Sequence, residues 1–254
     1  MAAIRFVRLE DWLEWQQSLH PSAIELGLDR VARVLGRTGW CSPGAPVITV
    51  GGTNGKGSCV ALLEAMLIAG GYKVGAFTSP HLVDYRERIR LGQRQVSSAS
   101  LVAAFERIAD ALGDDSLTFF EFNTLAALLV FETWRPDVML LEVGLGGRLD
   151  AVNVVDPDVA VVVSVALDHM EWLGTDLESI GREKGPVGGS RRRESPRDGN
   201  TEVRELADHL PERSVLSTDD FDVFHAKLIE LDYEWLQLML PCFTLQEMDN
   251  PTDG

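Results

Sequence analysis

The residues best placed to do chemistry in this sequence form a glycine-rich segment, Gly51-Gly52-Thr53-Asn54-Gly55-Lys56-Gly57-Ser58. It follows a short β-branched run and precedes an apolar stretch with helical spacing. Glycines let backbone N–H groups approach phosphate oxygens closely, and a helix N-terminus adds partial positive charge. In this arrangement Lys56 would neutralise the β- and γ-phosphates of a nucleotide, and the Ser58 hydroxyl would ligate Mg²⁺. Gly57 separates Lys56 from Ser58, which departs from the strict P-loop pattern, so the competing interpretation is a flexible turn with a surface lysine.

A second candidate residue is Glu142, which stands near the end of an apolar run at residues 138–143. Burying an unpaired carboxylate is costly, and a nearby cation would remove that cost. Mg²⁺ takes oxygen ligands from carboxylates, hydroxyl groups and water, so Glu142 is a candidate metal ligand. From the residues alone, His169 is better explained as a hydrogen-bonded histidine in a loop.

The elements that must position these residues follow from the hydrophobic pattern. Short, almost wholly apolar runs alternate with amphipathic stretches, which is typical of a parallel sheet covered by helices on both faces. Ligands of such sheets bind outside the carboxyl ends of the strands, where the glycine-rich segment and Glu142 both lie. We expect strands at residues 46–50, 72–78, 138–143 and 159–166, and helices at residues 9–35 (broken at Pro21 and resuming at 24–35), 59–69, 100–112 and 123–134.

The composition is that of an ordinary globular protein of 254 residues, 45% hydrophobic and 24% charged, with a formal net charge of −16. A surface for duplex nucleic acid needs clustered Lys and Arg, and only Arg191-Arg192-Arg193 qualifies, in what is better explained as a solvated loop. We therefore expect no nucleic-acid partner. ATP is not excluded, because local backbone dipoles and a metal can outweigh the global charge.

Cysteine usage and hydrophobicity indicate a compartment. The three cysteines, Cys41, Cys59 and Cys242, are widely spaced and imply neither a disulfide framework nor a metal site, which fits a reducing cytoplasm. Residues 1–20 lack the apolar segment of a signal peptide, and the longest apolar runs are too short to span a bilayer. We expect a cytoplasmic protein without membrane contact.

The composition changes after Lys184. Residues 185–200 are rich in Gly, Pro, Ser and Arg and are expected to form a linker. Residues 201–254 are expected to form an acidic tail, and residues 185–254 as a whole carry 7 Lys and Arg against 15 Asp and Glu. Apolar residues recur at helical spacing between Phe224 and Leu238, which predicts one amphipathic helix there.

The glycine-rich segment resembles the phosphate loop of the folylpolyglutamate synthase/dihydrofolate synthase family, in the Mur ligase superfamily. Later motifs agree with that family in order and spacing: Ser79-Pro80-His81-Leu82, Glu87-Arg88-Ile89, Phe119-Phe120-Glu121-Phe122, Glu142-Val143-Gly144-Leu145-Gly146-Gly147-Arg148-Leu149-Asp150, Asn153, Leu167-Asp168-His169, Leu173-Gly174 and Glu183-Lys184. Together they cover residues 1–184 almost continuously, and the ordered set is highly specific.

The resemblance implies an α/β fold like the central domain of the Mur ligases, with a P-loop and a mostly parallel sheet. It implies an ATP-dependent ligase that adds L-glutamate to dihydropteroate or reduced folates through an acyl phosphate. The nucleotide would be held by Thr53, Asn54, Gly55, Lys56, Gly57 and Ser58.

The resemblance also implies two Mg²⁺ ions, one near Ser58 and Glu142 and the other near Ser79, Glu142 and His169. The family's lysine that matches Lys184 is carbamylated, which makes Lys184 a candidate for organising the metal site. Lys56, His169 and Lys184 are thus the candidate catalytic residues. Considered alone, Lys184 is explained as a surface lysine closing a helix, and the residues after it no longer match the family.

A pterin pocket is implied by further matching positions, namely Glu25, Leu26, Thr118, Phe119, Phe120 and Leu149. Aromatic rings stack on flat heterocycles, although core packing explains Phe119 and Phe120 equally well. This combination resembles the bifunctional bacterial type, which acts on dihydropteroate as well as on reduced folates.

Nothing in residues 185–254 resembles the family's C-terminal domain, so we expect weak or absent ligase turnover by this chain alone. One alternative is a non-catalytic nucleotide- or pterin-binding module that works with a partner chain supplying the missing domain. Another is a related Mur ligase acting on cell-wall precursors, which the folate-type residues 56–58 and 119–122 disfavour.

Overall fold

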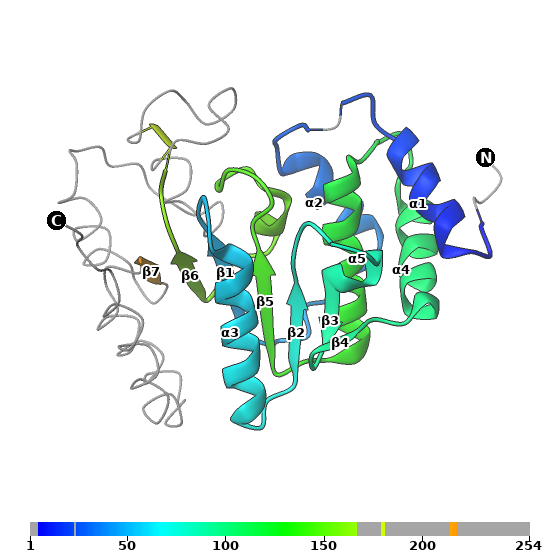
Figure 1. Cartoon of the computed structure of the whole chain (residues 1–254). Helices are drawn as coiled ribbons and strands as arrows, with labels where there is room; N and C mark the ends of the chain where they lie inside the picture. Colours follow the sequence, from blue (N-terminus) through cyan, green and yellow to red (C-terminus); the bar gives the residue numbers. More distant parts are fainter. Residues whose placement is uncertain (1–4, 23, 167–178, 181–213, 218–254) are drawn as a thin grey trace, which may run out of the picture.

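The computed structural model describes residues 5–22, 24–166, 179–180 and 214–217, and these contain a seven-stranded sheet in the order β4-β3-β2-β5-β1-β6-β7 (Figure 1). The strands are β1 (Val47–Gly51), β2 (Val74–Phe77), β3 (Ile89–Leu91), β4 (Arg94–Gln95), β5 (Val138–Glu142), β6 (Val159–Val162) and β7 (Ser214–Ser217). Along the sheet, β2, β5, β1, β6 and β7 pair with their neighbours in parallel. At the other edge, β3 pairs antiparallel with both β2 and β4. The expected mostly parallel α/β sheet is confirmed.

Helices cover both faces of the sheet, as expected (Figure 1). On one face, α3 (Lys56–Ala69) packs Val60, Leu63 and Leu67 against Ile48 and Val50 of β1. The opposite face is covered by α5 (Phe119–Trp134), which contacts α1 (Leu9–Ser18), α2 (Asp29–Arg37) and α4 (Ser98–Ala111). Every residue of α5 from Glu121 to Phe131 is buried, so this helix is enclosed on all sides. Two 3₁₀ turns complete the described elements, η1 (Tyr85–Arg88) and η2 (Ala151–Val154).

Several element boundaries differ from the sequence-based expectation. The helix expected from residue 24 begins at Asp29, because Gly27 takes a φ of 155° and interrupts the helical backbone. The helix expected from residue 123 begins at Phe119, where Thr118 and Glu121 form a capping box. The strand expected to reach residue 166 ends at Val162.

The β3–β4 hairpin was missed by the sequence interpretation. Its strands have three and two residues, and its turn places Gly92 and Gln93 at φ values of 60° and 62°. Such paired positive φ values are typical of tight hairpin turns. Strands this short give no hydrophobic periodicity to detect, although Ile89 of β3 is buried in the core.

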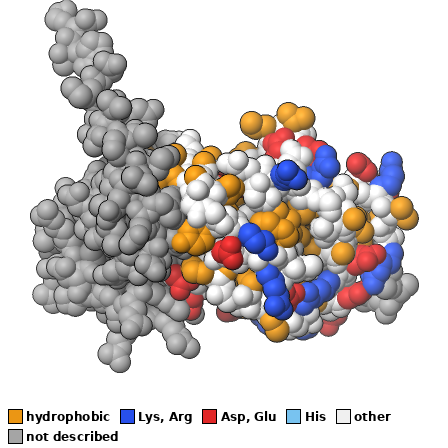
Figure 2. All heavy atoms as spheres, turned by 90° about the horizontal axis from the view of Figure 1, so that it is seen from below, with side chains coloured by type: hydrophobic (Ala, Val, Ile, Leu, Met, Phe, Trp, Pro, Cys, Tyr) orange, Lys and Arg blue, Asp and Glu red, His pale blue; other side chains and the backbone are white. Residues whose placement is uncertain are grey.

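Within the segment expected to form an acidic tail, Ser214–Ser217 pair in parallel with β6 from Val159 to Val162. The linker at residues 185–200 and the helix expected at residues 224–238 lie outside the described residues. None of the described helices is long and apolar enough to cross a membrane. On the face seen in Figure 2, Lys and Arg side chains alternate with Asp and Glu among the described residues.

Candidate active site

The phosphate loop connects β1 to α3 at the carboxyl edge of the sheet. Gly52 has a φ of 138°, and a Cβ there would lie 3.0 Å from the backbone N of Ser164. Gly55, with a φ of 82°, is the N-cap of α3. These two positions need glycine, one for backbone conformation and close approach and the other for its left-handed φ.

Among the described residues, no side chain caps the N-terminus of α3. Gly55 provides no side-chain cap, the first turn contains no acidic residue, and Gly57 and Ser58 are exposed. The first N–H groups of an α-helix have no acceptor within the helix and carry partial positive charge. This end of α3 can therefore receive an anion.

Lys56 lies over the loop from which it projects. Its Nζ donates to the carbonyl oxygens of Gly52, at 3.0 Å, and Thr53, at 3.1 Å. The ammonium is thus held at the phosphate loop, beside the start of α3. Both carbonyl contacts can be exchanged for phosphate oxygens, which attract a cation more strongly.

The loop is fastened to the chain that follows β6. The Thr53 N–H donates to the carbonyl of Ser164 at 2.8 Å, and the Ala166 N–H donates to the Thr53 hydroxyl at 3.0 Å. Ser164 Oγ accepts from the Asn54 N–H and donates to the Asn54 carbonyl, both at 3.0 Å. Thr53 and Asn54, which are predicted to bind the nucleotide, therefore also shape the loop, and Ser164 is a supporting residue that the sequence interpretation missed.

Glu142 ends β5 directly beside β1, in register with Val50. Its side chain is buried, and Oε2 accepts the Ser79 N–H at 3.0 Å. A Cβ placed on Gly57 would lie 3.7 Å from Glu142 Oε1, so the carboxylate faces the first turn of α3. Burial raises the pKa of Glu142, against the lowering effects of the Ser79 N–H and of Lys56. A cation at this position would stabilise the ionised form.

The structure thus brings Lys56, Gly57, Ser79 and Glu142 to one corner of the sheet edge. Within the described residues, no group of three or more His, Cys, Asp and Glu side chains could hold a metal ion. A divalent ion beside Glu142 would therefore need hydroxyl, phosphate or water oxygens to complete its shell. His169 and Lys184 lie outside the described residues.

Two parts of the expected pterin pocket contact the glycine-rich loop after β5. The Gly27 N–H donates to the Leu149 carbonyl at 3.3 Å, which brings the segment with Glu25 and Leu26 next to Leu149. The exposed carboxylate of Glu25 pairs with Arg30 and, at 3.1 Å, with His20 Nε2.

Thr118, Phe119 and Phe120 have different surroundings. Thr118 is the N-cap of α5, and its hydroxyl accepts the Glu121 N–H at 3.3 Å. Phe120 covers Gly144 so closely that a Cβ there would lie 2.5 Å from the ring. Phe119 contacts Tyr85, with ring centroids 6.2 Å apart, and its ring lies 5.4 Å from Arg88 Cζ. Both rings are partly exposed, so packing and ligand contact are both open to them.

Known proteins resemble this chain over most of its described length. A comparison with models of protein families gave no match. The dihydrofolate synthase/folylpolyglutamate synthase of Escherichia coli strain K12 is 53% identical over 179 residues, which are 70% of this chain and 42% of that protein. Over its matched length, the chain belongs to the dihydrofolate synthase/folylpolyglutamate synthase family.

Solved structures agree with this family assignment. Escherichia coli FolC in complex with DHPP and ADP matches with a TM-score of 0.69 and 53% identity, over 70% of this chain and 43% of that one. A bifunctional folylpolyglutamate synthase/dihydrofolate synthase with Mn, AMPPNP and L-glutamate bound matches with a TM-score of 0.67 and 49% identity, over 73% and 45% of the two chains. The chain therefore spans less than half of the length of these family members.

Further residues of the family-like motifs have contacts that the sequence did not reveal. Arg88 is buried, and its Nε donates to His81 Nδ1 at 2.8 Å, which joins the two motifs that contain them. Asp150 is buried and accepts the N–H groups of Leu145, at 2.8 Å, and Val152, at 3.1 Å. Burial raises the pKa of Asp150 to about 7, against these hydrogen bonds. Motif order alone singled out these residues without indicating a role.

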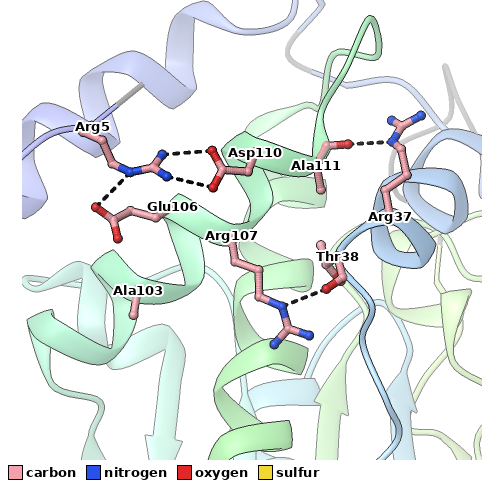
Figure 3. A pocket seen from close by; sticks show the side chains of 8 residues that line it. All are labelled: Arg5, Arg37, Thr38, Ala103, Glu106, Arg107, Asp110 and Ala111. Atoms are coloured by element: carbon pink, nitrogen blue, oxygen red, sulfur yellow. Dashed lines mark hydrogen bonds and ion pairs between the residues drawn. The ribbon is translucent and has the colours of Figure 1, made fainter. Parts of the chain in front are cut away.

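A pocket of about 420 Å³ lies away from this corner, against the outer helices (Figure 3). It is lined by Arg5, Arg37, Thr38, Ala103, Glu106, Arg107, Asp110 and Ala111. Its arginines are engaged in the fold: Arg5 pairs with Asp110 at 2.7 Å, Arg37 donates to the Ala111 carbonyl at 2.6 Å, and Arg107 donates to the Thr38 carbonyl at 2.9 Å. These contacts tie the N-terminal segment and α2 to α4, so the pocket is explained by packing.

Proposed function

We propose that this chain provides the nucleotide-binding part of an ATP-dependent ligase that adds L-glutamate to dihydropteroate or reduced folates. One observation carries the proposal: the uncapped N-terminus of α3, the Lys56 ammonium and the buried Glu142 carboxylate converge at one corner of the sheet. A triphosphate with a divalent ion matches that corner in charge, because its phosphates suit the helix end and its metal suits the carboxylate.

The ligands of the similar structures support the choice of substrates. Those structures contain ADP and DHPP, or AMPPNP with Mn and L-glutamate. We infer that the same classes of ligand bind here, with ATP at residues 53–58 and the pterin beside Phe119, Phe120 and Leu149. One divalent ion near Ser58 and Glu142 would neutralise phosphate charge, and a second ion would lie near Ser79, Glu142 and His169.

The reaction follows from the chemistry of these substrates. The carboxylate of dihydropteroate or folate attacks the γ-phosphorus of ATP, which yields an acyl phosphate and ADP. The amine of glutamate then attacks the acyl carbon and displaces phosphate, which forms the amide. Lys56 and the α3 N–H groups would bind the negative charge on the transferred group, and no covalent enzyme nucleophile is needed.

Residues 1–184 are proposed as the unit that holds the nucleotide and the pterin, while a role for Lys184 as a carbamylated residue stays a prediction. Glutamate binding and turnover belong to the whole ligase, because the chain spans less than half of its relatives. The proposal for this chain is therefore tested by binding rather than by product formation.

The test is calorimetric titration of the full chain with MgATP. We expect Lys56→Ala to lower the affinity at least tenfold, which corresponds to about 1.4 kcal/mol. Lys73→Ala is the matched control, because Lys73 directly precedes β2 and so lies at the amino ends of the parallel strands, away from the phosphate loop. Its Nζ contacts the carbonyls of Trp134 and Arg135 at 3.3 and 3.2 Å. It should change the affinity less than about twofold, which is within about 0.4 kcal/mol. Absence of MgATP binding by the unaltered chain would contradict the proposal.

A second titration tests the pterin half of the proposal. With nucleotide present, dihydropteroate should bind, whereas a UDP-linked muropeptide should not. Binding of the muropeptide alone would reassign the site to a ligase of cell-wall precursors. Binding of nucleotide without either acceptor would reduce the proposal to a nucleotide-binding module.

A further inference from the structure

One guanidinium holds both ends of the loop that presents Ser79. Arg90, in β3, donates from Nη1 to the Thr78 hydroxyl at 2.8 Å and to the Glu87 carbonyl at 3.2 Å. Thr78 directly precedes Ser79, and Glu87 lies at the far end of the same loop. A single nitrogen therefore closes the segment between residues 78 and 87.

The interior of this loop is held by its own carboxylate. Glu87 accepts the N–H groups of Leu82 at 2.7 Å, Val83 at 3.2 Å and Asp84 at 2.8 Å. These hydrogen bonds lower the pKa of Glu87, so the carboxylate stays ionised and the loop keeps its shape. What remains to be fixed is the position of the loop relative to the phosphate site.

The other nitrogens of Arg90 reach the helix that begins at the phosphate loop. Nε and Nη2 both lie 2.8 Å from Oε2 of Glu64, and Glu64 Oε1 accepts the Gln93 N–H at 3.2 Å. Glu64 is buried within α3, two turns after Lys56. Because a helix moves as a rigid element, fixing Glu64 fixes the N-terminus of α3 as well.

We propose that Arg90 is a positioning residue that sets the distance between the start of α3 and the Ser79 segment bound to Glu142. The inference rests on the proposed function, since it concerns how the phosphate and metal parts of that site are held together. Arg90 suits this role because its planar fork donates in several directions at once. Lysine has a single nitrogen and cannot reach Glu64, Thr78 and the Glu87 carbonyl with the same geometry.

Losing this link affects one part of nucleotide binding more than the other. The phosphate loop keeps its hydrogen bonds to Ser164 and Ala166 whatever occupies position 90. The Ser79–Glu142 contact, by contrast, belongs to the loop that Arg90 holds. The metal-dependent share of nucleotide affinity should therefore fall, while binding of metal-free ATP persists.

The experiment measures ATP affinity of the full chain by calorimetry, with EDTA and with excess Mg²⁺. For Arg90→Lys we expect the ratio of the two affinities to fall at least tenfold relative to the unaltered chain, with metal-free affinity within about twofold. Arg94→Gln is the matched control, because Arg94 is an exposed neighbour in β4. It should leave both affinities unchanged. A general loss of stability would lower both affinities together and leave their ratio unchanged.

A folded Arg90→Lys chain with an unchanged Mg²⁺ dependence overturns the inference. If that variant does not fold, Arg90→Leu combined with Glu64→Leu removes the buried pair as a unit, which such sites tolerate better than a lone charge. The double variant must show the same loss of Mg²⁺ dependence, and a normal dependence again overturns the inference. An unaltered chain that binds no nucleotide refutes the proposed function first, and the role of Arg90 falls with it.

Discussion

Two helices of this molecule begin in opposite ways, and the contrast separates a structural end from a binding end. At the start of α5, the Glu121 N–H donates to the Thr118 hydroxyl at 3.3 Å, and Glu121 Oε2 accepts the Thr118 N–H at 2.7 Å. The start of α4 is closed similarly, because Ser97 Oγ accepts the Ser100 N–H at 3.1 Å. The start of α3 has a glycine N-cap and no acidic residue in its first turn.

The same asymmetry holds for the carboxylates around these helix ends. Glu121, at the start of α5, is buried but paired with Arg30, whose Nη2 lies 2.7 Å from Oε1. Glu142 and Asp150, near the start of α3, are buried with raised pKa values, and both accept hydrogen bonds from backbone N–H groups. Of these three helix starts, those of α4 and α5 are capped by side chains, and that of α3, where we propose a ligand, is not.

Disrupting the capped start of α5 should lower the free energy of unfolding more than substitutions at the starts of α3 and α4. Glu121→Ala removes the capping box and leaves the Arg30 guanidinium, which is largely buried, with the exposed Glu25 as its remaining carboxylate among the described residues. Loss of one partner of a buried pair costs on the order of 3–5 kcal/mol. Urea unfolding should show that decrease in the free energy of unfolding, and Glu121→Gln, which keeps an acceptor for the cap, should lose less. A decrease below about 1 kcal/mol would mean that the pair is not what holds this helix end.

The sequence drew attention to the phosphate loop but not to the capping residues of α5, and both α3 and α5 begin earlier than expected. The phosphate loop stands out because Gly52, Gly55 and Lys56 have the residue types and the spacing that phosphate binding would require, namely glycine backbone and a cation. The capping box was not recognised, so α5 was placed four residues late, although Thr118 and Glu121 have the required spacing.

Contacts between distant segments could not be predicted from periodicity. Ser164 supports the phosphate loop from 110 residues away, and Arg90 joins α3 to the Ser79 segment. Neither residue belongs to a repeating pattern, and strands of three and two residues such as β3 and β4 are too short to show a hydrophobic period. The helix boundary at Asp29 also depended on a backbone angle, at Gly27, that residue type alone does not fix.

The buried carboxylates near the start of α3 should make the free energy of unfolding depend on pH. Burial raises the folded-state pKa of Asp150 from 3.8 to about 7, so the unfolded chain releases this proton first as the pH rises. The contribution of protonated Asp150 to the free energy of unfolding is fully present below about pH 4. Between about pH 4 and pH 7 it is lost at no more than about 1.4 kcal/mol per pH unit. Glu142, whose pKa is also raised by burial, acts in the same direction.

Chemical unfolding between about pH 5 and pH 8 measures this effect in the chain and in Asp150→Asn. The variant should show a shallower fall in stability as the pH rises, because it removes one of the two groups. Parallel curves for both chains would show that Asp150 does not change its protonation on folding in this range. In that case only Glu142, and not Asp150, would differ from the paired carboxylate of Glu121.

The smallest effects on stability are expected when serine is replaced by alanine at the starts of α4 and α3. Ser97→Ala removes the N-cap of α4 and should lower stability by about 1 kcal/mol. Ser58→Ala, in the exposed first turn of α3, should change stability by less than about 0.5 kcal/mol. The order should reverse for Mg²⁺-dependent ATP affinity, which should fall several-fold in Ser58→Ala and stay unchanged in Ser97→Ala. Unfolding and calorimetry on the same two proteins decide the matter, and a Ser58→Ala chain that loses stability but keeps its affinity would show that this hydroxyl serves the fold.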